Sequence, residues 1–324
     1  MEFIGKQYKI SLDMHEELNK LAYQCLVNFQ KEHGHLKNVK KEDALYQWFL
    51  LQSKLLPPKS RSIEKAKDFC YPSEAKSQLQ SFEKAVKTGQ DLVEYMSRDV
   101  LNAAFEDKMF SDWRFYHFHL SDPNKRHLKD KRFLKRGDYL LIAYMESSDD
   151  DTMYFLQIIP HKRANWTKEE LVRVLADNWP ELIKRNVFEG SLTASINDRD
   201  RKQLRENNIN APVDLGDGRV IIGLGSGICG DGSSFAIRHK CVRFGNEAQI
   251  FAMRIETDVD TIGELIHEKL QNEQKAFNLE LMDLPNTQTA VFRVSDTPVF
   301  LGVTLKKYVV ADSREQVETI LNFV

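Results

Sequence analysis

Residues 113–166 read WRFYHFHLSDPNKRHLKDKRFLKRGDYLLIAYMESSDDDTMYFLQIIPHKRANW, and most of the chemical signal of the chain lies there. In residues 114–120 aromatic and polar side chains alternate, which is typical of a β-strand. YLLIAYM (139–145) and MYFLQIIP (153–160) predict two more strands, joined by the short acidic turn ESSDDD. The apolar density of these two strands indicates a sheet with a covered face. We therefore expect a small antiparallel sheet at the centre of the chain.

The flanking sequence predicts an α+β protein with three regions. Residues 1–110 carry apolar residues mostly at helical spacing and predict a helical scaffold. Residues 111–190 hold the basic β-hairpin, followed by a helix for which Thr167 and Glu170 form a capping box. Residues 191–324 predict an α+β domain of unknown role.

The third region contains two segments with patterns of their own. The run CVRFGNEAQIFAMRI (241–255) predicts a hairpin. The preceding glycine-rich run (223–232) follows a predicted strand, as a phosphate-binding loop does. Its spacing matches neither G-x-G-x-x-G nor the P-loop, so we interpret it as a flexible β-loop.

Composition sets the protein class only broadly. The chain has 324 residues, a formal net charge of -2 and four cysteines without a C-x-x-C pair. This cysteine usage fits a reducing compartment. The sequence shows neither a secretory leader nor an apolar run of the ~18 residues that a membrane span needs. We expect a cytoplasmic protein.

The start of the quoted stretch is strongly basic. Residues 113–136 hold eight basic and two acidic residues, a formal local charge of +6. Such a cluster is typical of a surface that binds phosphates, and a solvated basic loop is the alternative. The residues that we expect to bind RNA are Arg114, Lys125, Arg126, Lys129, Lys131 and Arg132.

The sharpest chemical signal is a pair of histidines two residues apart. Side chains at i and i+2 of a strand share one face, so His117 and His119 should project side by side. His161 follows the third predicted strand and can reach the same place in a compact sheet. Imidazoles suit RNA cleavage, because one can accept the 2′-hydroxyl proton while another protonates the leaving oxygen. Lys135 and Arg136, or Arg114, could supply the cation that steadies the phosphorane.

Two other interpretations of the histidines stay open. Three histidines can bind zinc or iron, although no carboxylate ligand accompanies them and the nearby positive charge disfavours a dication. The histidines can also be purely structural hydrogen-bonding residues. We expect no metal and no cofactor.

The quoted motifs resemble two groups of proteins. SDWRFYHFHL, KRGDYLLIAYM and MYFLQIIPH are similar to a group of uncharacterised bacterial proteins with a D-W-x-x-x-H-x-H-L segment. The basic strand and the hairpin also resemble, more faintly, the RelE/barnase-like ribonuclease toxins, which cut RNA on a small antiparallel sheet without metal. The second resemblance implies these site residues: His117, His119, Lys135, Arg136, Tyr139 and His161.

The function predicted from these signals is a metal-independent endoribonuclease of the toxin or phage-defence type. RNA and a protein partner such as an antitoxin are the expected partners, and no membrane is involved. The alternative is a non-enzymatic sensor or adaptor that binds a partner through its flanking domains.

Overall fold

The computed structural model describes residues 1–146, 151–161, 168–283 and 288–322. With about 42% helix and 21% strand over this part of the chain, the predicted α+β class is confirmed. The chain forms two compact units, residues 1–49 with 239–324 and residues 50–238. These boundaries differ from those of the three sequence regions, whose separate roles stay a prediction. Among the described residues, no helix is both long and apolar enough to cross a membrane.

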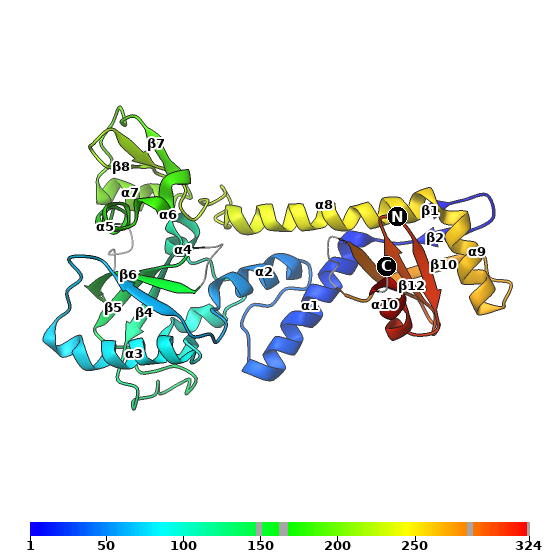
Figure 1. Ribbon diagram of the computed structural model, residues 1–324, viewed down its shortest axis with the longest axis horizontal. Helices are drawn as coiled ribbons and strands as arrows, with labels where there is room; N and C mark the ends of the chain where they lie inside the picture. Colours follow the sequence, from blue (N-terminus) through cyan, green and yellow to red (C-terminus); the bar gives the residue numbers. More distant parts are fainter. Residues whose placement is uncertain (147–150, 162–167, 284–287, 323–324) are drawn as a thin grey trace. The chain divides into compact units, whose positions relative to one another are not determined.

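The unit formed by residues 50–238 is built on a four-stranded sheet (Figure 1). Its strand order is β3-β6-β5-β4, so β3 and β4 form the two edges. The β4–β5 and β5–β6 pairs are antiparallel, as predicted, whereas β3 pairs in parallel with β6. The sequence prediction missed β3, because the preceding PPKSRS has the composition of an exposed connector. The strands are β3 (Ser62–Lys65), β4 (Phe115–Leu120), β5 (Tyr139–Tyr144) and β6 (Thr152–Pro160).

Helices cover both faces of this sheet. On one face, α3 (Lys76–Thr88) places the Phe82 ring 4.8 Å from that of Phe118. On the other, α5 (Glu170–Asn178) buries Leu171, Val172 and Leu175 in a core that also contains Ile142 and Ile159. Burying a large apolar side chain contributes roughly 1.5–3 kcal/mol, so these contacts fix which way each strand faces. The predicted capping residue Thr167 lies outside the described residues.

The segment between α3 and β4 is turned, not continuously helical as the sequence predicted. Asp91 accepts the N–H of Val93 at 2.9 Å, and Ser97 accepts that of Asp99 at 3.4 Å. Such side-chain bonds to the backbone start new turns in place of a longer helix. The resulting elements are η2 (Val93–Tyr95), η3 (Arg98–Leu101) and α4 (Lys108–Trp113).

The rest of this unit is a small three-stranded sheet with short helices. Its strand order is β7-β9-β8, and both neighbouring pairs are antiparallel. The remaining elements are η1 (Ser73–Ala75), α6 (Pro180–Ile183), η5 (Lys184–Asn186), β7 (Val187–Glu189), α7 (Asp198–Glu206), β8 (Val213–Asp214) and β9 (Arg219–Ile221).

A long helix, α8 (Phe235–Thr257), stands where the sequence predicted a hairpin over residues 241–255. Its buried residues Ala248, Phe251, Ala252 and Ile255 recur at spacings of three and four, which places them on one helical face. Strand propensity favoured the hairpin, and burial of this face overrides it.

The unit formed by residues 1–49 and 239–324 holds a six-stranded sheet of order β1-β2-β10-β11-β12-β13. Strands β1 and β2 form a hairpin, because Gly5 donates its N–H to the Tyr8 carbonyl at 2.9 Å and closes a turn. The elements are β1 (Glu2–Ile4), β2 (Lys9–Ser11), α1 (Met14–His33), α2 (Ala44–Lys54, which runs on into the other unit), α9 (Val259–Leu270), β10 (Ala276–Leu281), β11 (Thr289–Val294), β12 (Phe300–Thr304), β13 (Tyr308–Ala311) and α10 (Arg314–Asn322).

Candidate functional site

Strand β4 presents His117 and His119 on the same face of the four-stranded sheet. The register pairs His117 with Ile142 and His119 with Leu140 on the neighbouring strand. Phe118 points to the opposite face, where it packs against the α3 side of the sheet. The burial of Phe118 therefore determines the direction of both imidazoles.

His161 joins this pair from the end of β6. Its backbone N–H donates to the carbonyl oxygen of Asp138 at 2.8 Å, which holds it beside the start of β5. The ring centroids of His119 and His161 lie 4.9 Å apart, and those of His117 and His119 lie 6.4 Å apart. The structure thus brings the three histidines together, with His119 in the middle.

The three imidazoles line one pocket, here called the histidine pocket, with a cavity volume of about 460 Å³. Sites for small molecules span roughly 300–1,000 Å³, so the cavity has room for a ligand. Leu140, Ile142 and Ile159 form an apolar wall, and Arg136 adds a cation. The remaining lining residues come from the residue before η3, from the connection between η3 and α4, and from the start of α4: Ser97, Phe105, Glu106, Asp107, Lys108 and Met109.

Asp107 connects the start of α4 to His117. As the N-cap of the helix, its Oδ1 accepts the backbone N–H groups of Met109 and Phe110 at 3.1 and 3.2 Å. Its Oδ2 lies 3.4 Å from Nδ1 of His117. The helix cap therefore holds a carboxylate against one ring nitrogen, which leaves Nε2 as the nitrogen for proton exchange.

His119 is the buried member of the group, with 4% of its surface exposed. Burial is the largest cause that lowers the pKa of its imidazole to about 3, and the positive charges of His117, Arg136 and His161 act in the same direction. Its Nδ1 has no hydrogen-bond partner among the residues that the structure describes. His119 is therefore neutral at neutral pH, and one of its nitrogens stays available.

The cation of the pocket, Arg136, is held by its neighbour in the chain. The backbone N–H of Gly137 donates to the Ser121 hydroxyl at 3.2 Å. A Cβ at Gly137 would lie 1.8 Å from the carbonyl oxygen of Leu120, so no larger residue fits there without moving the backbone. The backbone at Gly137 thus lies against the backbone at Leu120 and Ser121. This contact places Arg136 next to the end of β4, where it lines the histidine pocket.

Three other predicted site residues do not line the histidine pocket. Tyr139 pairs with Leu120 and lies on the opposite face from Leu140, so strand alternation turns it away from the histidines. Lys135 is exposed in the connection between β4 and β5. Arg114 follows α4 in a left-handed conformation, with φ 59°, and its Nε donates to the Met145 carbonyl at 3.0 Å.

The other residues that we expected to bind RNA lie in the same β4–β5 connection. Lys125 pairs with Asp122 at 3.0 Å, Arg132 pairs with Asp130 at 2.8 Å, and Arg126 pairs with Glu94. Lys129 and Lys131 are exposed. The local carboxylates offset part of the positive charge that the sequence counts as +6.

Sequence reasoning missed the acidic wall of the pocket. Asp107 precedes the apolar pair Met109-Phe110, which is the pattern of a helix N-cap and could have marked the start of α4. No sequence signal indicated that this cap faces His117. Lys108 also lines the pocket, but its Nζ donates to the Arg205 carbonyl and to Oδ1 of Asn208, both at 3.0 Å.

The glycine-rich run has a packing role next to α4. It leads directly into helix α8, not into a strand as the sequence predicted. The N–H of Gly225 donates to the Asp112 carbonyl at 2.8 Å, and that of Gly227 donates to the Ser111 carbonyl at 3.0 Å. A Cβ at Gly225 would lie 2.4 Å from the Ser111 oxygen, so glycine permits this close contact.

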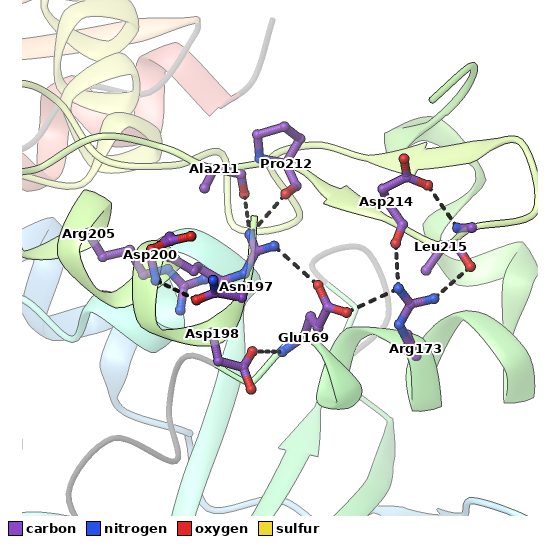
Figure 2. A network of polar contacts seen from close by, with 12 residues as sticks. Glu169, Arg173, Asn197, Asp198, Asp200, Arg205, Ala211, Pro212, Asp214 and Leu215 are labelled. Carbon is purple, nitrogen blue, oxygen red and sulfur yellow. Dashed lines mark hydrogen bonds and ion pairs between the residues drawn. The ribbon is translucent and has the colours of Figure 1, made fainter. Parts of the chain in front are cut away.

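A second polar group, here called the arginine network, joins α5 and α7 to β8 (Figure 2). Glu169 accepts from Arg173 at 3.1 Å and from Arg201 at 3.4 Å. Arg201 also donates to the carbonyls of Ala211 and Pro212, and Arg173 donates to those of Asp214 and Leu215. These bonds tie the small sheet to the helices beside it.

Arg205 extends the arginine network toward α4. It is fully buried, its guanidinium pairs with the Asp112 carboxylate, and it stacks 3.7 Å above the Trp113 ring. Burial lowers the pKa of Arg205 to about 10 and raises that of Asp112. The desolvation of both groups thus offsets part of their attraction, as in other buried ion pairs.

Compared with known proteins, the chain matches no family model, no curated protein and no solved structure. The two resemblances noted in the sequence therefore stay predictions. Over the described ranges, no group of three or more His, Cys, Asp or Glu side chains is arranged to hold a metal ion.

Proposed function

We propose that the chain is a metal-independent endoribonuclease of the toxin or phage-defence type, and that the histidine pocket is its active site. The observation that carries the proposal is the convergence of three imidazoles and one arginine on a single cavity. Imidazole suits this role because its ordinary pKa lies nearest to neutral pH. A cytoplasmic location and a protein partner such as an antitoxin belong to the same proposal.

The reaction needs one proton acceptor and one proton donor. His117, oriented by Asp107, accepts the proton of the RNA 2′-hydroxyl at Nε2. The 2′ oxygen forms a bond to phosphorus while the bond from phosphorus to the 5′ oxygen breaks. His161 donates a proton to that departing oxygen. The products are a 2′,3′-cyclic phosphate and a 5′-hydroxyl end.

Arg136 and His119 have supporting roles in this scheme. The Arg136 guanidinium stabilises the negative charge that grows on the phosphorane oxygens. His119 stays neutral, because burial lowers its pKa to about 3, and it can therefore serve as a hydrogen-bonding group between the two imidazoles that exchange protons. The apolar wall of Leu140, Ile142 and Ile159 offers a surface for a base or sugar.

Single-stranded RNA is the substrate form that this cavity favours. A volume of about 460 Å³ suits a single nucleotide unit and is too small for a duplex. Proteins that read RNA by sequence mostly bind unpaired nucleotides, whose bases can enter such pockets.

The test is cleavage of single-stranded RNA by the purified chain in the presence of a chelator, together with growth after induced expression. We expect cleavage and growth arrest with the natural sequence and neither with the triple variant His117→Ala, His119→Ala and His161→Ala. The matched control replaces three exposed histidines, His15, His35 and His239, with alanine and should behave like the natural sequence. Cleavage or toxicity that survives the pocket triple would overturn the mechanism. A natural chain that cleaves no RNA would favour a sensor or adaptor.

A further inference from the structure

A buried lysine lies next to the histidine pocket. Lys54, the last residue of α2, has 5% of its surface exposed. Its Nζ donates to the carbonyl oxygens of Asn102 and Phe105 at 3.0 and 2.9 Å and lies 5.7 Å from the centroid of the Phe105 ring. A lysine is rarely buried to this extent unless its ammonium has specific partners.

Both carbonyls belong to the short segment that carries Asp107. This segment runs from Asn102, which follows η3, to Asp107, which caps α4. The two hydrogen bonds from the Lys54 ammonium therefore hold the segment 102–107 near the end that carries Asp107. Since Asp107 faces His117, the lysine indirectly sets the position of the carboxylate that orients the imidazole.

A small cavity joins the lysine to the same pair. Its volume is about 20 Å³, and Lys54, Asp107 and His117 all line it. A site of this kind needs about 10–15 Å³ to hold one water molecule, and the water needs two or more polar partners. The cavity meets the size condition, and Lys54, Asp107 and His117 offer polar side chains on its lining, so there is room for a single water between the ammonium and the Asp107–His117 pair.

We propose that Lys54 is a positioning residue of the histidine pocket, which holds Asp107 against His117 through the segment 102–107 and through one bridging water. This inference rests on the proposed function for its role in catalysis, while the positioning itself stands on the contacts alone. Burial lowers the pKa of Lys54 to about 8, against the opposing effect of nearby carboxylates, so the ammonium loses its charge at mildly alkaline pH. The titratable groups that face it are Asp99, Glu106, Asp107, Tyr116 and His117.

The first test is Lys54→Met, studied by NMR without any RNA. We expect the chemical shifts of the His117 ring to change and the amide protons of Met109 and Phe110 to exchange about fivefold faster, as a loosened cap would allow. The matched control is Lys65→Met, because the Lys65 Nζ also lies over a ring, 5.5 Å from the Phe69 centroid, but it pairs with Glu83 and lines neither cavity. It should leave both signals unchanged. Unchanged signals in Lys54→Met would overturn the proposal.

A second measurement needs no variant and covers the case in which Lys54→Met does not fold. In the natural chain the His117 ring signals should show an additional step near pH 8, where Lys54 loses its charge. Ordinary carboxyl and imidazole groups titrate lower, at about 4 and about 6.5. Absence of that step would contradict the coupling between Lys54 and His117.

The catalytic readout separates the two proposals. If the natural chain cleaves RNA, Lys54→Met should lower kcat by about 10- to 100-fold, as small misplacements of catalytic groups do, with KM little changed. If the natural chain cleaves no RNA, the proposed function fails, and the NMR signals still decide whether Lys54 positions Asp107. A folded Lys54→Met variant with full kcat would remove the catalytic role.

Discussion

The histidine pocket and the arginine network lie in the same compact unit, and each contains buried titratable side chains, His119 in the pocket and Arg201 and Arg205 in the network. The arginines point at protein groups: Arg201 and Arg173 donate to backbone carbonyls, and both also donate to Glu169. Figure 2 shows Arg173 and Glu169 in this network. The histidines instead line a cavity of about 460 Å³. One of them, His119, is buried with a ring nitrogen that has no partner in the described part of the chain.

This difference separates structural from functional burial of polar groups. A buried polar group without a partner costs about 1–3 kcal/mol. Each region holds such a group among the described residues, Nδ1 of His119 in the pocket and Nε of Arg201 in the network. Another guanidinium nitrogen of Arg201, Nη1, donates to protein carbonyls and joins a helix to the small sheet, whereas His119 lines a cavity with room for a ligand. We therefore expect substitutions in the two regions to affect different properties.

The largest effect is expected at His117. Replacement with alanine should lower RNA cleavage by about 10²–10⁴-fold, because a positioned general base contributes that much. The free energy of unfolding should change by less than about 1 kcal/mol, since the imidazole is partly exposed. Single-turnover cleavage and urea unfolding measure the two quantities. If His117→Ala lost so much stability that unfolding alone explained its lower activity, the histidine pocket would not differ from the arginine network.

Arg205→Met should have the opposite profile. It leaves the Asp112 carboxylate buried without its partner, which costs roughly 3–5 kcal/mol of unfolding free energy. Adding Asp112→Leu should restore part of the loss, because removing both charges also removes their desolvation. Urea unfolding of the single and double variants checks this, and a neutral Arg205→Met would show that the pair contributes nothing.

His119 should make stability depend on pH. Its folded-state pKa is about 3, below the ordinary value of about 6.5. Below the unfolded value only the unfolded chain takes up the proton, so the free energy of unfolding falls by up to about 1.4 kcal/mol per pH unit as the pH drops toward 3. The contribution of His119 to the free energy of unfolding is fully present above about pH 6.5. His119→Asn should flatten the curve measured by urea unfolding from pH 7 to 4, and His35→Asn should not.

The smallest effect on cleavage is expected for Asp107→Asn. Asparagine caps a helix as well as aspartate does, so stability should stay within about 0.5 kcal/mol. The charge facing His117 is lost, which is worth roughly 1.5 kcal/mol and should lower cleavage about tenfold. Asp107→Ala should in addition lose about 1 kcal/mol of stability with the cap. Equal cleavage by Asp107→Asn and the natural chain would show that Asp107 is only a cap.

Local patterns in the sequence predicted the central sheet and the face shared by His117 and His119. Alternation over β4 and the apolar density of β5 and β6 depend on neighbouring residues alone. Helix α8 was predicted wrongly, because burial of one face against distant residues overrode local propensity.

The second half of the pocket could not be predicted in the same way. Asp107 and Lys54 come from residues predicted as helical scaffold. Asp107 lies near His117 in the sequence, but its contact with the ring depends on where α4 begins. Lys54 shares a cavity with His117 only through packing of elements far apart in the chain. Tyr139 was placed in the site by resemblance, but the register of β5 turns it to the opposite face.

The most direct test of the central claim is the chemistry of the RNA ends formed in the presence of a chelator. We predict 2′,3′-cyclic phosphate and 5′-hydroxyl ends with the natural chain, and loss of these products with His117→Ala at a temperature where that variant is folded. Ends of another kind, or the same products from His117→Ala at the natural rate, would contradict the assignment of the histidine pocket as the active site.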